Sequence, residues 1–190
     1  MVDVPKIKVS KEEFAEALFY WLAKQVNTKA IKQTAKLFDI RDKEHKDSSE
    51  PEKLFGLNLR SKKDFNKLVE ELLDLNMWLI VRACERVFED IDKRNECLDI
   101  FHHIVYERLI EGTKENRRQW MLLMTAKYID YNKATETEHP SGPAWVLAMV
   151  INKNLFGEVN PDALVQFHIG AYVAESIKAL EEAIKQYDIQ

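Results

Sequence analysis

The sequence predicts an all-α fold, a bundle of about six to eight helices that are mostly antiparallel. Apolar residues recur at helical spacing along most of the chain, and cap-type residues stand where these segments begin. Glycine and proline are scarce, with five of each in 190 residues. Sheet proteins need many turns, and turns draw on glycine and proline. Short connections between helices favour antiparallel neighbours.

The first helix is predicted to begin at Ser10, because Ser10 and Glu13 have the spacing of a capping box. A second helical pattern follows over residues 28–40. The pattern then fails, since residues 41–53 contain none of the hydrophobic residues that recur at helical spacing elsewhere. We expect a single helical domain over 1–190, with an N-terminal helix pair at 10–40, a polar loop at 41–60 and a helical body at 61–190.

The helical body is predicted to contain five helices. The longest starts at Ser61 and extends as far as residue 93, and a helix rich in histidine follows it to Gly112, a residue type suited to a helix end. The remaining three helices are expected to start at Thr113, at Pro143 and at residues 160–162, which supply a cap, a first-position proline and a first-turn carboxylate, and the last helix runs to about Tyr187.

Composition excludes several classes of protein. The formal net charge is −4, from 32 acidic and 28 basic residues, so a general basic face is missing and a nucleic-acid partner is disfavoured. The two cysteines, Cys84 and Cys97, form no CxxC pair, which argues against a disulfide scaffold and a zinc knuckle. No signal-peptide pattern and no run of about 18 apolar residues is present. We therefore expect no membrane partner and a cytoplasmic location.

The histidine helix holds a candidate metal site. Asp99, His103 and Glu107 follow one another at intervals of four residues, which places all three on one polar stripe of the helix. Imidazole and carboxylate groups on one face are ligands that zinc or iron accepts. The HExxH motif is absent, and only one near-match to the Glu-x-x-His pattern of di-iron bundles occurs. A solvated helix face is the alternative interpretation.

A second candidate metal site consists of carboxylates one helical turn apart. Glu71 and Asp74 have this spacing inside "VEELLDLNMWL", and Glu13 and Glu16 repeat it on the first helix. The pair of segments resembles the all-α nucleotide pyrophosphatases of the MazG and dimeric dUTPase type. That resemblance implies a hydrolase that holds Mg²⁺ against a triphosphate through these carboxylates. The two segments lie further apart in this chain than in the simple family pattern.

Residues 28–40, "TKAIKQTAKLFDI", resemble the first helix of a helix-turn-helix as found in TetR-like regulators. The resemblance implies a DNA-binding head joined to a ligand-binding body. The chain departs from the pattern at Asp39, where the turn prefers glycine. It departs again in the acidic segment that follows, which stands where a recognition helix should be.

Trp78 and Arg82 are candidate ligand or partner residues. Trp78 lies on the polar side of its predicted helix, next to Arg82 at the following turn. A large aromatic side chain among charges is either shielded by another helix or part of a partner surface, where tryptophan and arginine are favoured. The sequence leaves both interpretations open.

The helix predicted after Thr113 supplies three more candidates. Arg117, Trp120 and Tyr128 share one face of this helix. Such an aromatic stripe is typical of a packed core, and a ligand groove is the alternative.

The last helix leads to a prediction about assembly. From residue 163 to 174 it is apolar on nearly every side, so this half belongs either at the centre of the fold or in a subunit interface. We expect a homo-oligomer, a homodimer formed through the C-terminal helices.

The sequence favours a helical binding or assembly module whose partner is unknown. A metal-dependent all-α hydrolase of the nucleotide pyrophosphatase type and a TetR-like one-component transcriptional regulator are the alternatives. The sequence contains no serine or cysteine nucleophile constellation, phosphate-binding glycine loop or nucleotide fingerprint. We therefore expect no cofactor, with a bound metal ion as the alternative.

Overall fold

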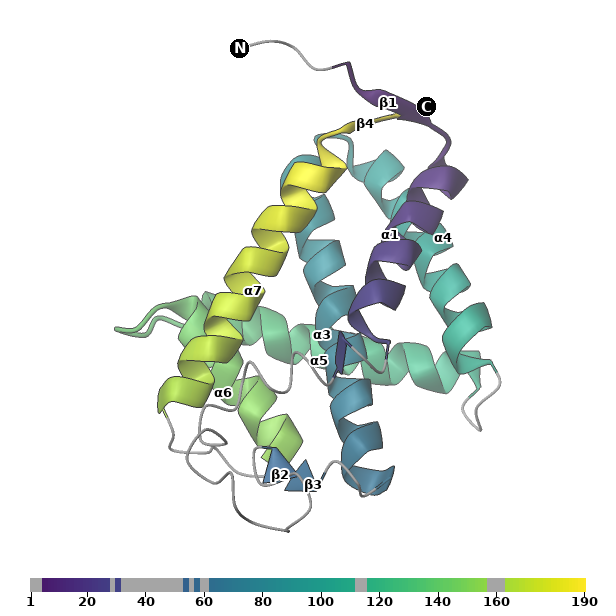
Figure 1. Ribbon diagram of the computed structural model, residues 1–190. Helices are drawn as coiled ribbons and strands as arrows, with labels where there is room; N and C mark the ends of the chain where they lie inside the picture. The colour runs from purple at the N-terminus through teal and green to yellow at the C-terminus, as the bar shows by residue number, and fades with distance from the viewer. Residues whose placement is uncertain are drawn as a thin grey trace.

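The computed structural model confirms the all-α prediction (Figure 1). It describes residues 5–27, 30–31, 53–54, 57–58, 62–111, 116–156 and 163–190. In these ranges the helices are α1 (Lys11–Gln25), α3 (Lys62–Val87), α4 (Ile91–Val105), the π-helical turn η2 (Tyr106–Ile110), α5 (Arg117–Glu136), α6 (Pro143–Phe156) and α7 (Ala163–Ile184). The short strands are β1 (Ile7–Val9), β2 (Lys53–Leu54), β3 (Leu57–Asn58) and β4 (Tyr187–Ile189).

Helix α3 is the centre of the bundle. It contacts α1, α4, α5, α6 and α7, while α1 packs mainly against α4. Successive helices run antiparallel, as α3 with α4 and α6 with α7 (Figure 1). The two most extensive packings, α1 on α4 and α3 on α7, join helices that run in the same direction. Helix α5 crosses the others at a steep angle, and this crossing shapes the candidate site below.

Two predicted helix starts are confirmed. Ser10 caps α1 through the complete capping box, because its hydroxyl accepts from the Glu13 amide while the Glu13 carboxylate accepts from the Ser10 amide at 2.8 Å. Pro143 is the first residue of α6, where its fixed φ suits a helix start and its missing N–H has no intrahelical partner to lose.

Two other helix boundaries differ from the prediction. Helix α3 ends at Val87, earlier than the predicted limit at residue 93, because the Asp90 side chain accepts from the Lys93 amide at 2.9 Å and starts α4. Helix α5 starts with Asn116 as its cap, three residues beyond Thr113. In both cases the side chain of an Asp or Asn provides the acceptor that caps the next helix, Asp90 before the predicted boundary and Asn116 after it.

The chain ends contribute a parallel strand pair that the sequence analysis missed. Strand β1 pairs with β4, with Ile7 opposite Tyr187 and Val9 opposite Ile189. The last helix accordingly ends at Ile184 rather than near Tyr187. Helix α1 follows β1 directly, so this pair ties the first helix to the C-terminus of α7.

Several predictions fall on residues outside the described ranges. These are most of the second N-terminal helix at 28–40, most of the polar loop at 41–60, and the predicted boundaries at Ser61, Gly112, Thr113 and residues 160–162. Among the helices that the structure describes, none is both long enough and apolar enough to span a bilayer.

Apolar residues of the C-terminal helices pack into the core of this chain. Ile169, Val173 and Ile177 of α7 are buried, and α7 packs against α3 and α6. α7 lies against α6 at Gly170, where a Cβ would be 3.6 Å from the Ala144 carbonyl oxygen, an ordinary van der Waals distance. Among the described side chains in the first half of α7, Ile169 and Val173 are buried, whereas Phe167 and Ala174 are exposed.

We expect Ser10→Ala to lower the free energy of unfolding by about 1 kcal/mol, because it removes the acceptor for the Glu13 amide. Urea unfolding followed by circular dichroism measures the change. Ser141→Ala, in the exposed connection between α5 and α6, is the matched control. If both substitutions lower the free energy of unfolding equally, the capping box at Ser10 adds no stability beyond that of an exposed loop serine.

Candidate functional site

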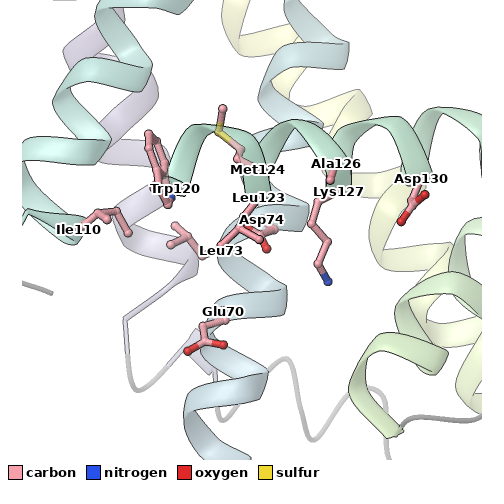
Figure 2. A pocket seen from close by; sticks show the side chains of 10 residues that line it. All are labelled: Glu70, Leu73, Asp74, Ile110, Trp120, Leu123, Met124, Ala126, Lys127 and Asp130. Atoms are coloured by element: carbon pink, nitrogen blue, oxygen red, sulfur yellow. The ribbon is translucent and has the colours of Figure 1, made fainter. Parts of the chain in front are cut away.

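A candidate site is a cleft of about 580 Å³ between α3 and α5 (Figure 2). We call it the α3–α5 cleft. The lining residues come from α3, the end of η2 and α5, and they are Glu70, Leu73, Asp74, Ile110, Trp120, Leu123, Met124, Ala126, Lys127 and Asp130. The spacing of Glu70, Leu73 and Asp74 puts all three on one face of α3.

The α3–α5 cleft has apolar walls and an acidic rim. Leu73 of α3 lies near Trp120 and Leu123 of α5 where the two helices cross (Figure 2). Glu70 lies one turn before Asp74 on α3, and Asp130 lies towards the C-terminal end of α5. The apolar part of the cleft is therefore flanked by carboxylates on both helices.

A buried carboxylate behind the cleft fixes the crossing of α3 and α5. Glu71 is 4% exposed and accepts from the Tyr131 hydroxyl at 2.7 Å and from Asn154 Nδ2 at 2.9 Å, both at Oε1. The ammonium of Lys127 forms an ion pair with Oε2. A buried charge is tolerated when it is paired and hydrogen-bonded, and here donors from α5 and α6 meet both conditions.

A second polar contact holds the same two helices together. The Trp78 indole N–H donates to Asn132 Oδ1 at 2.8 Å, and the Trp78 ring packs edge-on against Tyr131 with centroids 5.7 Å apart. Trp78 is 1% exposed. Of the two interpretations left open by the sequence, the structure shows shielding by another helix.

His102 and Tyr128 form a half-buried pair between α4 and α5. His102 Nε2 lies 3.4 Å from the Tyr128 hydroxyl. Burial lowers the pKa of His102, although the nearby Asp99 carboxylate opposes this shift. Burial, with Asp74 adding to it, raises the pKa of Tyr128 well above its ordinary value. Both side chains are therefore neutral at pH 7.

The predicted histidine stripe lies on the surface. His103 Nε2 is 3.1 Å from Glu107 Oε1, and both side chains are about half exposed, at 47% and 51%. Asp99, one turn earlier, is exposed. In the part of the chain that the structure describes, no three His, Cys, Asp or Glu side chains converge to hold a metal ion. The stripe is present as predicted, and its metal binding stays a prediction.

The carboxylates of the pyrophosphatase-like pattern are engaged in other contacts. Glu13 belongs to the capping box, and Glu16 forms a two-pronged ion pair with Arg108. Glu71 is held by Lys127 and its two other donors, while Asp74, one turn on, lines the cleft. A magnesium ion at Glu71 would have to displace these protein donors.

The five predicted ligand or partner residues lie in four separate places. Trp78 and Arg82 border a smaller cavity of about 320 Å³ between α3, α6 and α7. Arg117 is exposed at the start of α5, and its guanidinium lies 5.8 Å from the Tyr106 ring. Trp120 lines the α3–α5 cleft, and Tyr128 faces His102. The structure does not bring these residues into one site.

Searches for similar proteins found no matching family model, no matching curated protein and no matching solved structure.

Sequence reasoning missed Lys127, Glu70 and Asp130 as site residues. Lys127 and Asp130 bracket Tyr128 on α5 but follow no recognisable motif, and Glu70 is an ordinary exposed glutamate in the pattern of α3. The available signal was the spacing of Glu70, Leu73 and Asp74, which mixes charged and apolar residues on one face. Such a face indicates a boundary between core and solvent.

We expect the stability of the protein to fall as the pH is lowered below 6.5, partly through His102. Its folded pKa lies below the unfolded value of 6.5, so in this range the unfolded chain binds the proton more readily. Only at a pH well above 6.5 is His102 neutral in both states, and there it contributes nothing to the pH dependence.

Urea unfolding of the native protein and of His102→Gln at pH 7.5, 6.5 and 5.5 measures this contribution. The native protein should lose more stability than the variant over that interval. If the native protein and His102→Gln lose the same stability between pH 7.5 and 5.5, the pKa of His102 is the same in the folded and unfolded states, and the prediction is wrong.

Proposed function

We propose that this chain is a helical assembly module that forms a homodimer through the outer surface of α5. The supporting observation is a group of large apolar side chains exposed on this one helix. Their exposed fractions are 42% for Met121, 64% for Leu122, 52% for Leu123 and 48% for Ile129. Single exposed apolar residues are ordinary, whereas a contiguous group on one helix is typical of an interaction surface.

The outer surface of α5 is complementary to itself. Arg118, Leu122, Ala126 and Asp130 follow at intervals of four residues and form one exposed ridge, which we call the α5 ridge. If two copies pack antiparallel about a two-fold axis, Arg118 of each faces Asp130 of the other. The same register places the bulky Leu122 against the small Ala126. Charge and shape therefore match in a single arrangement.

The α5 ridge is solvent-exposed along its length, and its second half, Ala126 and Asp130, also borders the α3–α5 cleft. The buried residues of α5 that pack inward, Trp120, Met124 and Tyr131, lie on the opposite side of the helix. Ridges built on a four-residue interval pack well in pairs, crossing at about −50°. Two-fold dimers are also the commonest symmetric assemblies. Because a stable interface buries about 1,600 Å² in total, we include Met121 and Ile129 as its flanks.

The proposed interface lies on α5 rather than on the C-terminal helices predicted from the sequence. In α7 the apolar residues Ile169, Val173 and Ile177 are already covered by the chain itself. Phe167, 62% exposed, is a large apolar side chain left at the start of that helix. We place the dimer in the cytoplasm, because both cysteines are free buried thiols and a reducing compartment suits them.

Sedimentation velocity of the untagged protein and its variants tests the dimer. We expect the native protein to be dimeric and Leu122→Asp to be monomeric, because the substitution buries a carboxylate against Ala126 of the second copy. Arg118→Asp and Asp130→Arg should each weaken the dimer at least about tenfold, and the double variant should recover it.

Phe167→Asp is the matched control, since it places the same charge at an equally exposed apolar position on α7. It should leave the dimer intact. The proposal is wrong if the native protein remains monomeric at the highest soluble concentration. It is also wrong if Phe167→Asp dissociates the dimer while Leu122→Asp does not, a result that would return the interface to the C-terminal helices.

A further inference from the structure

We propose that the α3–α5 cleft binds a small organic cation, an amine joined to an apolar body. This inference goes beyond the dimer and rests on the cleft alone. Three features support it. They are the size of the cleft, the arrangement of its apolar and acidic residues, and the ion pair that Lys127, the one basic side chain among the described lining residues, forms with Glu71.

The size of the cleft suits a small molecule. Its volume of about 580 Å³ falls within the range of about 300–1,000 Å³ that is usual for ligand pockets. Six of the ten lining residues are apolar, and they are Leu73, Ile110, Trp120, Leu123, Met124 and Ala126. Trp120 and Met124 are almost fully buried, at 5% exposure each, so this wall is held by the core. A ligand with an apolar body can bury surface against it.

The charge of the cleft favours a cation. Glu70, Asp74 and Asp130 contribute three carboxylates, whereas Lys127 is the one basic side chain among the described lining residues. Its ammonium is paired with Glu71 behind the cleft. No described side chain forms an ion pair with Glu70 or Asp130. In the dimer proposed above Asp130 faces Arg118 of the second copy, so the negative charge that an entering ammonium group would meet in the cleft comes from α3, with Glu70 at its exposed edge.

Asp74 is the inner of the three carboxylates. It is half-buried, while Glu70 and Asp130 are exposed. It lies beside Leu73, near the crossing of α3 and α5 (Figure 2). Attraction between opposite charges is stronger where water is partly excluded. We therefore place the ammonium at Asp74 and Glu70, with the apolar body against Leu73, Trp120 and Met124.

A bare metal ion fits this cleft less well than an organic cation does. Among the described residues no three potential metal ligands converge. The apolar side chains of the cleft also offer no oxygen atoms to replace the water shell of such an ion. An anionic ligand would face repulsion from all three carboxylates.

The cleft and the dimer can be separated experimentally. Ala126 and Asp130 belong both to the cleft lining and to the α5 ridge, whereas Glu70, Leu73 and Asp74 lie on α3 outside the ridge. Substitutions on α3 therefore test the ligand site without altering the proposed dimer contact. Sedimentation velocity of each variant checks this separation.

Isothermal titration calorimetry with three probes of one shape tests the inference. The probes are 4-phenylbutylamine, 4-phenylbutanol and 4-phenylbutyrate, which carry a positive, a neutral and a negative head group on the same apolar body. We expect the amine to bind, the alcohol to bind at least about tenfold more weakly and the carboxylate not to bind.

Variants then locate the bound amine. Glu70→Gln and Asp74→Asn should each weaken its binding, whereas Glu175→Gln, which removes an exposed carboxylate from α7, should not. If Asp74→Asn fails to fold by circular dichroism, Glu70→Gln alone decides. The inference is overturned if no probe binds, if all three bind equally, or if Glu175→Gln weakens the amine as much as Glu70→Gln does.

Discussion

The buried carboxylate of Glu71 joins three helices at one point, and the position of α5 depends on it. Its donors are Lys127 and Tyr131 on α5 and Asn154 on α6. Removing a charge from water costs several kcal/mol unless partners compensate for it. Because one register of α5 on α3 supplies both Lys127 and Tyr131, the carboxylate favours that register. Slipping α5 by one turn would leave Glu71 and Lys127 without each other.

That register decides which face of α5 is buried and which is exposed. Tyr131 and Trp120 turn inward, so the α5 ridge turns outward and Leu123 faces the cleft. The proposed dimer surface and the proposed ligand cleft are thus two neighbouring faces of one helix. A ligand in the cleft would contact Ala126 and Asp130, which the second copy also approaches. Assembly and ligand binding are therefore expected to influence each other.

Local interactions could be predicted from the sequence, and distant ones could not. The capping box at Ser10, the helix start at Pro143 and the His103–Glu107 pair depend on residues within one turn of each other. The spacing of Glu71 and Asp74 was visible, but their separate roles were not, since Lys127 lies 56 residues beyond Glu71. The β1–β4 pair joins the two chain ends through three residues each, which is too short for a strand pattern.

Hydrogen–deuterium exchange of the Glu71→Ala variant, followed by mass spectrometry, tests the role of this carboxylate most directly. The reference is Glu85→Ala, which removes another carboxylate of α3. In the native protein Glu85 forms an ion pair with Arg82 at the surface. We expect amides of α5 to exchange faster in Glu71→Ala, with α1 and α4 little changed, and α5 to keep its protection in Glu85→Ala. Unchanged protection of α5 in Glu71→Ala would contradict the conclusion that this carboxylate holds the helix in place.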